Sequence, residues 1–327
     1  MTSSPTASSR SFTVAVVGGG RLAWGTLGML RAAQKSGAAI DIVGYARSGD
    51  GREVLKRGGA RVVDSAAGAV DGATVVVVAV PAPAVIDVAR AAAAAACGDQ
   101  VILHAARGVD VDGALPHQVL RRETCWKKIV VIGGPLYLDD ASAGRHLNAA
   151  LASRFDEAMN AVRTITVGAP LRLHQTHDIV GVELCGAFSN VGHLAAGLAA
   201  GAGFSETDQG LLAVRALLEA GRLGGVMGAA PSTFSGLAGM GDLIPRRVSS
   251  QRKHRELGQA FIVDGGVRDA LRQLEGAVSA TALAVLAQDK GIVLPLTASV
   301  AAILAGASAP STLAAVLDLD LGLQAGV

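Results

Sequence analysis

Three consecutive glycines, set between a short apolar strand pattern and a helical repeat, constrain this chain more than any other feature. Residues 12–17 (FTVAVV) are apolar and rich in β-branched side chains, and Gly18, Gly19 and Gly20 follow them directly. A helical repeat comes next, with apolar residues at about one-turn spacing: Leu22, Leu27, Leu30 and Ala33. Glycine at 18 and 20 permits a tight turn and lets the backbone approach a pyrophosphate, which the amino end of the helix attracts. The pattern predicts a strand–turn–helix unit that binds a dinucleotide, with a plain strand–helix turn as the alternative.

The first half of the chain alternates strand patterns with helical ones. Six strand patterns occur, at residues 12–17, 40–45, 61–63, 74–80, 100–104 and 128–132. The fourth, TVVVVAV, is apolar on both faces, which is typical of a strand in the middle of a parallel sheet with helices on both sides. Helical patterns, such as those at 52–57 and 85–96, lie between the strands. This order predicts an α/β fold with an N-terminal Rossmann-like, doubly wound parallel sheet.

The second half is helical. Strand patterns end after residues 171–174 (LRLH), and helical periodicity runs from about Asp178 to the end. Since 327 residues is about twice a typical domain, we expect two folded domains. Residues 11–176 form the dinucleotide-binding domain and residues 177–327 an all-helical substrate domain. Residues 1–10 (MTSSPTASSR) are polar and lack the apolar segment of a signal peptide, so we expect a disordered tail there.

Composition and charge exclude several classes of protein. A net charge of +2 and ten aromatic residues favour neither phosphate-backbone binding nor base stacking, so no nucleic-acid partner is expected. The three cysteines have no CxxC spacing, which argues against a disulfide framework or a zinc site. The uncharged stretch 291–317 is long enough to span a membrane, but Pro295 and Pro310 interrupt it. Two packed helices explain this stretch better than a membrane span. We expect the protein to be a cytoplasmic homodimer that acts on a small molecule and uses no metal.

The end of the second strand indicates which dinucleotide is bound. NAD-binding domains usually place an acid there for the ribose hydroxyls, whereas this chain has Tyr45-Ala46-Arg47-Ser48. A guanidinium beside a hydroxyl suits a 2′-phosphate, so NADP is favoured and NAD stays possible. The alternative is that Arg47 is a solvated surface residue.

Motifs along nearly the whole chain closely resemble those of the bacterial NAD(P)-dependent glycerol-3-phosphate dehydrogenases. They are VVGGG…WGT (16–26), AVPA (79–82), ARG (106–108), GGP (133–135), DIVGVELCGAFSNV (178–191), GLAGMGDL (236–243) and LEG (274–276). The resemblance implies reduction of dihydroxyacetone phosphate, with substrate in the cleft between the domains. Together with the glycine turn, it implies these cofactor contacts: Gly18, Gly20, Arg21, Leu22, Trp24, Arg47, Ser48, Pro81 and Glu275. In the family, the acid that matches Glu275 lies near the adenine-ribose end of the cofactor.

The chain departs from this family at both of its lysines. Hydride transfer to a ketone leaves a developing alkoxide, which needs a proton donor or a cation beside it. The family's ATKG segment reads AARG here, with Arg107 for lysine, and its GALKN segment reads GAFSN, with Ser189 for lysine. Arginine keeps the charge at 107, but serine loses it at 189, and no lysine lies between Lys128 and Lys253. Asp242 matches the acid that orients the family's lysine, so it is expected to serve another cationic group or to cap a helix.

Histidines are candidates for the missing proton donor. His193 lies four residues after Ser189, one turn along the same helix face, and His104 lies three residues before Arg107. Either could equally be a packing residue. The candidate catalytic residues are therefore Arg107, Ser189, Asn190, His193 and Asp242.

The substrate contacts implied by the resemblance are also altered. The family's phosphate-binding Arg-Asn pair aligns with Lys253-His254, and its GPSF segment aligns with residues 134–137 (GPLY), so Gly134, Lys253 and His254 are the expected contacts. A basic run, comprising Arg246, Arg247, Arg252, Lys253 and Arg255, is either an anion clamp or a solvated face.

Three functions fit these residues. The leading one is an NAD(P)H-dependent reductase that acts on a different small carbonyl or imine substrate. The second is the family reaction itself, with Arg107 supplying the charge. The third is a dinucleotide-binding protein that has lost hydride transfer or catalyses a redox-neutral reaction.

Overall fold

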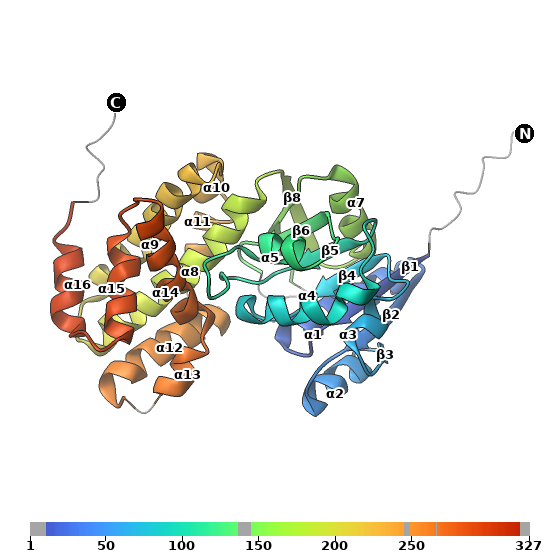
Figure 1. Ribbon diagram of the computed structural model, residues 1–327, viewed down its shortest axis with the longest axis horizontal. Coiled ribbons are helices and arrows are strands. Elements are labelled where there is room, and N and C mark those ends of the chain that lie inside the picture. The colour runs from blue at the N-terminus through green and yellow to red at the C-terminus, as the bar shows by residue number, and fades with distance from the viewer. Residues whose placement is uncertain (1–10, 137–144, 245–248, 266, 321–327) are drawn as a thin grey trace, which may run out of the picture.

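A computed structural model describes residues 11–136, 145–244, 249–265 and 267–320 of the chain. A sheet domain and a helical domain lie side by side (Figure 1). The sheet has the strand order β3-β2-β1-β4-β5-β6-β7-β8. Its strands are β1 (Phe12–Val17), β2 (Ile40–Tyr45), β3 (Arg61–Val62), β4 (Val75–Val78), β5 (Val101–His104), β6 (Lys128–Gly133), β7 (Leu147–Ala152) and β8 (Leu171–Thr176).

The six predicted strands all form, and they pair in parallel from β3 to β6. The predicted doubly wound parallel sheet is confirmed, and the structure adds one antiparallel pair, β6 with β7. Sequence patterns missed β7 (LNAALA) because it contains no β-branched residue and no polar alternation. Its partner β8 is the edge strand and has the mixed sequence LRLHQT, which the patterns placed at the end of the strand region.

Helices cover both faces of the sheet, as the apolar sequence of β4 predicts. Val76 and Val78 belong to one buried cluster, and Val75 and Val77 belong to the cluster on the opposite face. The main helices of this domain are α1 (Arg21–Lys35), α2 (Gly49–Arg57), α3 (Ala66–Val70), α4 (Val85–Ala92), α5 (Pro116–Glu123) and α7 (Asp156–Ile165).

The helical domain is built around α8 (Ile179–Gly201), which is buried along almost its whole length. Glycines let other helices approach it closely: a Cβ at Gly192 would lie 2.8 Å from the Cβ of Ala216, and a Cβ at Gly197 would lie 2.3 Å from the carbonyl oxygen of Arg255. The remaining helices are α9 (Glu206–Val226), α10 (Pro231–Ser235), α11 (Met240–Leu243), α12 (Ser249–Val263), α13 (Arg268–Arg272), α14 (Glu275–Asp289), α15 (Pro295–Leu304) and α16 (Ala309–Leu317). The predicted domain boundary at residue 176 falls between the end of β8 and the start of α8.

Two apolar stretches are long enough to be compared with membrane spans. Within the described residues, α8 passes the length and hydropathy test, but the stretch that passes is entirely buried inside the protein, as in a core helix. The uncharged stretch 291–317 forms α15 and α16, two helices that pack on each other, as predicted. The ten-residue N-terminal tail lies outside the described residues.

Candidate active site

The turn between β1 and α1 exposes backbone that a dinucleotide phosphate can approach. Gly18 has φ of +126°, and a Cβ there would lie 2.2 Å from the carbonyl oxygen of Ala79, so only glycine fits. Gly20 precedes the first turn of α1 and has open space where a Cβ would be. No side chain caps the helix, so its first amide groups remain available to an anion. The turn fits the pyrophosphate of a dinucleotide.

A cavity of about 430 Å³ opens beside this turn, where several parallel strands of the sheet end. Ligands of doubly wound folds bind at this edge, outside the carboxyl ends of the strands. Nine of the predicted site residues line the cavity: Gly20, Arg21, Leu22, Pro81, Arg107, Gly134, Asp242, Lys253 and Glu275. The sheet domain and the helical domain therefore meet around one space that holds both the cofactor turn and the candidate catalytic residues.

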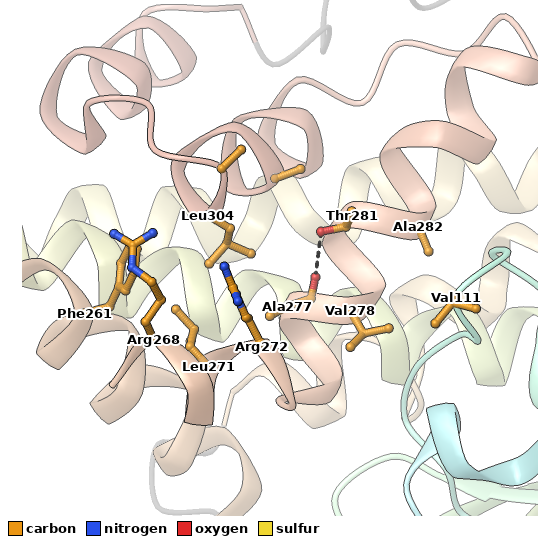
Figure 2. Close-up of a pocket in the computed structure, with 12 residues that line it drawn as sticks. Val111, Phe261, Arg268, Leu271, Arg272, Ala277, Val278, Thr281, Ala282 and Leu304 are labelled. Carbon is orange, nitrogen blue, oxygen red and sulfur yellow. Dashed lines mark hydrogen bonds between the residues drawn. The ribbon is translucent and has the colours of Figure 1, made fainter. Parts of the chain in front are cut away.

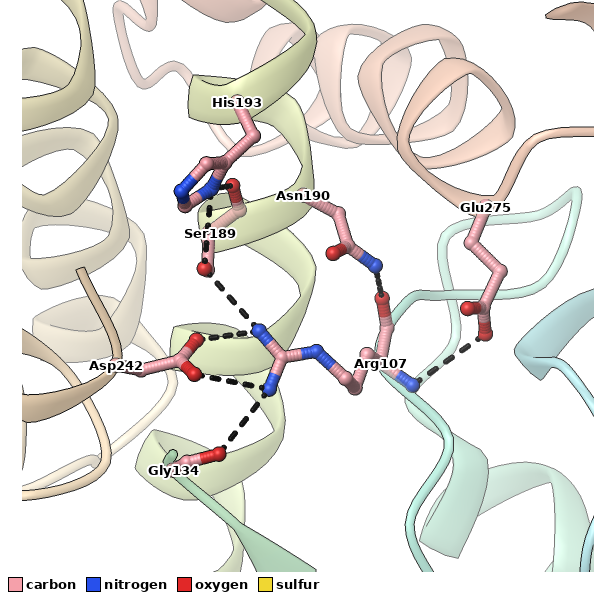
Figure 3. A network of polar contacts seen from close by, with 7 residues as sticks. All are labelled: Arg107, Gly134, Ser189, Asn190, His193, Asp242 and Glu275. Atoms are coloured by element: carbon pink, nitrogen blue, oxygen red, sulfur yellow. Dashed lines mark hydrogen bonds and ion pairs between the residues drawn. The ribbon is translucent and has the colours of Figure 1, made fainter. Parts of the chain in front are cut away.

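The guanidinium of Arg107 is the centre of the polar network beside this cavity (Figure 3). One terminal nitrogen, Nη1, donates to Asp242 Oδ1 at 3.3 Å and to the carbonyl oxygen of Gly134 at 3.4 Å. The other, Nη2, forms an ion pair with Asp242 Oδ2 and donates to the hydroxyl oxygen of Ser189 at 3.1 Å. Asp242 is almost fully buried, and its carboxylate therefore needs this cation. The forked geometry is one that arginine provides and lysine does not.

This arrangement corrects one expectation from the sequence. Replacement of lysine by Ser189 was expected to remove the positive charge from that position. The guanidinium of Arg107 lies at hydrogen-bond distance from Ser189, so a positive charge is present there. Asp242 serves another cation, as expected, and that cation is Arg107.

Two side chains from the helical domain hold the backbone of Arg107. Asn190 on α8 donates from Nδ2 to the carbonyl oxygen of Arg107 at 2.7 Å. Glu275, the first residue of α14, accepts from the amide of Ala82 at 2.7 Å and from the amide of Arg107 at 3.4 Å. Glu275 thus lines the cavity beside Arg107.

His193 lies one turn beyond Ser189 on α8, behind the guanidinium (Figure 3). Its Nδ1 is 2.6 Å from the carbonyl oxygen of Ser189 and 3.5 Å from the hydroxyl oxygen of the same residue. A carbonyl only accepts, so Nδ1 carries a hydrogen that is directed at the helix backbone. Burial lowers the pKa of the His193 imidazole, which favours the neutral ring. Neither Ser189 nor His193 is among the residues that line the cavity, but Ser189 contacts the cavity-lining guanidinium of Arg107, whereas the imidazole lies beyond Ser189.

Besides Gly18 in the turn itself, three predicted cofactor residues do not line the cavity: Trp24, Arg47 and Ser48. Ser48 caps α2, accepting from the amide of Gly51 at 3.1 Å, and Arg47 beside it is exposed. A Cβ on Gly19 would lie 2.2 Å from the Cα of Gly51, so the glycine turn packs on this end of α2. Arg47 and Ser48 are therefore neighbours of the turn. Trp24 is exposed on α1 with the guanidinium of Arg57 5.8 Å from its ring centroid.

The predicted substrate contacts divide into two groups. Gly134 and Lys253 line the cavity, whereas His254 is buried and its Nε2 accepts from the amide of Gly276 at 3.1 Å. Of the basic run, Arg252 pairs with Glu256, Arg255 donates to Gln209, and Arg246 and Arg247 lie outside the described residues, as does Tyr137.

The cavity also contains residues that sequence reasoning did not assign to the site: Ala79, Val80, Ala105, Ala106, Ile132, Gly133 and Leu136. Most follow directly on the ends of β4, β5 and β6 or form them. Their small or apolar side chains have no reactive or charged group that would identify them in the sequence. Only their position at the end of a predicted strand could have identified them.

A second cavity, of about 380 Å³, lies among α12, α13, α14 and α15 (Figure 2). It is lined mainly by apolar side chains, with Arg268 stacked over Phe261 at 5.2 Å and Arg272 beside it. None of the predicted site residues lines it, whereas nine of them line the cavity beside the glycine turn, which is therefore the candidate active site.

Two protein families match parts of this chain. The family described as "NAD-dependent glycerol-3-phosphate dehydrogenase C-terminus" matches residues 178–315. The family described as "NADP oxidoreductase coenzyme F420-dependent" matches residues 13–108, which include the glycine turn and Arg107.

Curated relatives and solved structures extend the comparison over the whole chain. The protein named glycerol-3-phosphate dehydrogenase [NAD(P)+] of Mesorhizobium japonicum is 33% identical over 313 residues, covering 91% of this chain and 89% of that protein. Its namesake from Cereibacter sphaeroides is 34% identical over 232 residues, covering 71% and 75% of the two chains. The crystal structure of glycerol-3-phosphate dehydrogenase from Coxiella burnetii superposes with a TM-score of 0.84 at 23% identity, covering 94% of this chain and 99% of that one.

Proposed function

Because this chain belongs to the NAD(P)-dependent glycerol-3-phosphate dehydrogenase family, we propose that it reduces dihydroxyacetone phosphate with NADPH, and that Arg107 replaces the family's two lysines. Family membership makes it an NAD(P)-dependent oxidoreductase. The finer proposal rests on one observation: the guanidinium of Arg107 reaches both Asp242 and Ser189. A single side chain thereby brings positive charge to both positions at which the family has lysine.

The cofactor is held by the turn and by the residues at the strand ends. The amides at the start of α1 receive the pyrophosphate, while Gly18 and Gly20 let it approach. Pro81 and Glu275 line the cavity beyond the turn, on the side of Arg107. Arg47 and Ser48, next to the turn, suit the 2′-phosphate of NADP. When bound, the nicotinamide supplies the hydride.

The residues around Arg107 stabilise the oxygen of the substrate. A hydride that adds to the carbonyl carbon turns the carbonyl oxygen into an alkoxide, which must then gain a proton. The oxygen of Ser189 accepts from Arg107, which leaves the Ser189 hydroxyl hydrogen available to the alkoxide. The guanidinium keeps its own protons, because its pKa is above about 12, and it stabilises the negative charge through Ser189 and by its position at the cavity. Solvent then restores the proton of Ser189.

Lys253 is the residue that suits the phosphate end of the substrate. It lies on α12, is exposed and lines the cavity, so its ammonium can reach an anion that enters there. We further propose that the protein acts in the cytoplasm as a homodimer on this small molecule alone.

A second candidate is a different small carbonyl or imine substrate, and the position of His254 favours it. The family's phosphate grip has two residues, but here His254 turns into the core to bind the amide of Gly276. Lys253 is left as the member of the pair at the cavity, which suits a substrate with a smaller anionic end or none.

A substrate panel separates these functions. NADPH and NADH binding to the purified chain is measured first, and NADPH oxidation is then followed with dihydroxyacetone phosphate, small ketoacids, aldehydes and imines. We expect dihydroxyacetone phosphate to give the highest kcat/KM. A nonphosphorylated carbonyl or imine that is turned over at least tenfold more efficiently would establish the second candidate instead. NADPH binding without oxidation by any compound would refute both and indicate a protein that has lost hydride transfer.

A further inference from the structure

A second polar cluster, separate from the cavity, lies where the two domains meet. It consists of Glu183 on α8, His104 at the end of β5 and His117 in the first turn of α5, and all three side chains are buried. Glu183 Oε2 is 2.5 Å from His117 Nδ1, and Oε1 accepts from the His117 amide at 2.9 Å. His104 Nε2 is 3.0 Å from Glu183 Oε1. One carboxylate from the helical domain thus contacts two elements of the sheet domain.

The two imidazoles keep this buried carboxylate ionised. Burial on its own raises the pKa of a carboxyl group, but His117 and His104 outweigh that effect and lower the pKa of Glu183 to about 2. A buried carboxylate that loses such partners is left with an uncompensated charge. The two hydrogen bonds from His117 are directional, and together with the close contact to His104 they resist displacement of α8 against α5 and β5.

The cluster and the active site lie along the same two segments. Glu183, Gly186 and Asn190 have the spacing i, i+3 and i+7, which places them on one face of α8 over two turns. Glu183 meets His104, a Cβ at Gly186 would lie 3.4 Å from the Cα of Arg107, and Asn190 donates to the carbonyl oxygen of Arg107. This face of α8 therefore runs along the segment 104–107 from one end to the other.

We propose that Glu183, with His104 and His117, positions Arg107 by fixing the register between α8 and the segment that carries the guanidinium. Glu183 is a positioning residue in this account, since it acts through Arg107 and Ser189 and lines no part of the cavity. The inference rests on the proposed function, because Arg107 has to be the residue that serves the reaction.

The kinetic test is Glu183→Gln, which keeps the shape of the side chain and removes its charge. We expect kcat to fall at least tenfold while the Kd for NADPH stays within twofold of the wild type, because the glycine turn is not involved. Glu219→Gln is the matched control. Glu219 is also a buried glutamate in the helical domain, where it accepts from the amides of Leu296 and Thr297 at 2.6 and 3.0 Å, away from Arg107.

The control should lose thermal stability and keep kcat within twofold. Equal losses of kcat in the two glutamine variants, or a Glu183→Gln variant with wild-type kcat, would overturn the proposal. If Glu183→Gln does not fold, His117 provides the same test. His117→Asn keeps a donor close to the place of Nδ1 and should retain kcat, whereas His117→Ala should lose it; equal kcat in these two variants would also overturn the proposal.

A thermal-unfolding cycle keeps the positioning inference separate from the proposed function. If the wild type reduces none of the compounds in the panel, the proposed function fails. The Tm is then measured for His117→Ala, for Arg107→Met and for the variant that combines the two substitutions. Once His117 no longer holds Glu183, the contacts of Arg107 should already be weakened. The Tm loss from Arg107→Met should therefore be at most half as large in the His117→Ala background as in the wild type. Tm losses that simply add would refute the positioning role.

Discussion

Arginine differs from lysine in reach and in the number of hydrogen bonds that it can donate, and position 107 depends on both differences. A lysine ammonium is a single point of charge. The guanidinium of Arg107 contacts both carboxylate oxygens of Asp242, the carbonyl oxygen of Gly134 and the hydroxyl of Ser189. These contacts couple position 107 to position 189, so one cation lies within hydrogen-bond distance of both Asp242 and Ser189.

The sequence predicts part of this arrangement. Family motifs identify positions 107, 189 and 242, and the lost lysines indicate that Asp242 needs a new partner. The pairing itself could not be predicted, because Arg107 and Asp242 are 135 residues apart and their contact depends on how the two domains pack. For the same reason, the sequence suggested His193 as the proton donor, and the structure shows its Nδ1 hydrogen directed at the backbone of its own helix.

The proposed role of Ser189 leads to a first prediction. Ser189→Ala removes the hydroxyl that accepts from Arg107 and that we propose protonates the alkoxide, so kcat should fall about 100-fold with little change in the Kd for NADPH. Steady-state kinetics and a fluorescence titration of NADPH measure the two effects. Ser153→Ala is the control, because Ser153 is equally buried but donates to Ile129 within the sheet. A Ser189→Ala variant with wild-type kcat would show that the Ser189 hydroxyl has no role in the reaction.

A second prediction concerns the choice of cofactor. If Arg47 pairs with the 2′-phosphate, Arg47→Ala should raise the Kd for NADPH about tenfold, which corresponds to about 1.4 kcal/mol, and change the Kd for NADH less than twofold. Arg61→Ala on the exposed end of β3 is the control, and it should leave both affinities unchanged. Equal loss of both cofactors in Arg47→Ala would show that Arg47 does not read the 2′-phosphate.

Helices and strands with a strong local sequence pattern could be predicted, and those with a weak pattern could not. β1, β2 and α1 form where the periodicity placed them, since each has strong apolar spacing, and glycines also mark the end of β1 and the start of α1. β7 lacks β-branched residues. Its position is fixed by pairing with β6, which precedes it in the chain, and with β8, which follows it. No local signal specifies that pairing, and the antiparallel pair was missed for the same reason.

The β1–α1 turn gives a third prediction. In Gly18→Ala, the new methyl group would lie 2.2 Å from the carbonyl oxygen of Ala79, at a φ of +126° that alanine avoids. We expect a lower Tm and loss of NADPH binding. Gly28→Ala is the control, because Gly28 lies exposed on α1 with open space around it, and there alanine should stabilise the protein by about 0.5–1 kcal/mol. NADPH binding at wild-type affinity by Gly18→Ala would show that the β1–α1 turn does not bind the cofactor.

At the scale of the whole molecule, contacts from the helical domain fix the cavity. Asn190, Glu275 and Glu183 all lie after residue 176 and hold backbone or side chains of the sheet domain. Length and periodicity predicted the two domains and the fold class. They could not predict which faces meet, because that depends on side chains such as Glu183, whose partners lie on two other elements, β5 and α5.

The ionised state of Glu183 gives a fourth prediction. The pKa of this carboxyl is lowered on folding to about 2, so the stability that its charge contributes is fully present above about pH 4.5 and is lost as the pH falls toward 2. Urea unfolding of wild type and Glu183→Gln should therefore differ by on the order of 3 kcal/mol at pH 6, and the difference should shrink between pH 4.5 and 2. A difference that is independent of pH over this interval would show that the charge of Glu183 does not stabilise the fold.

The central claim is that Arg107 carries the charge that this enzyme needs for reduction. The most direct test is kcat/KM for dihydroxyacetone phosphate with NADPH in the wild type and in Arg107→Met, which keeps much of the side-chain volume and removes the charge. We expect turnover by the wild type, a loss of at least about 100-fold in kcat/KM in the variant, and the same Kd for NADPH in the two proteins. Equal turnover by wild type and variant, or a wild type that binds NADPH and does not reduce dihydroxyacetone phosphate, would contradict it.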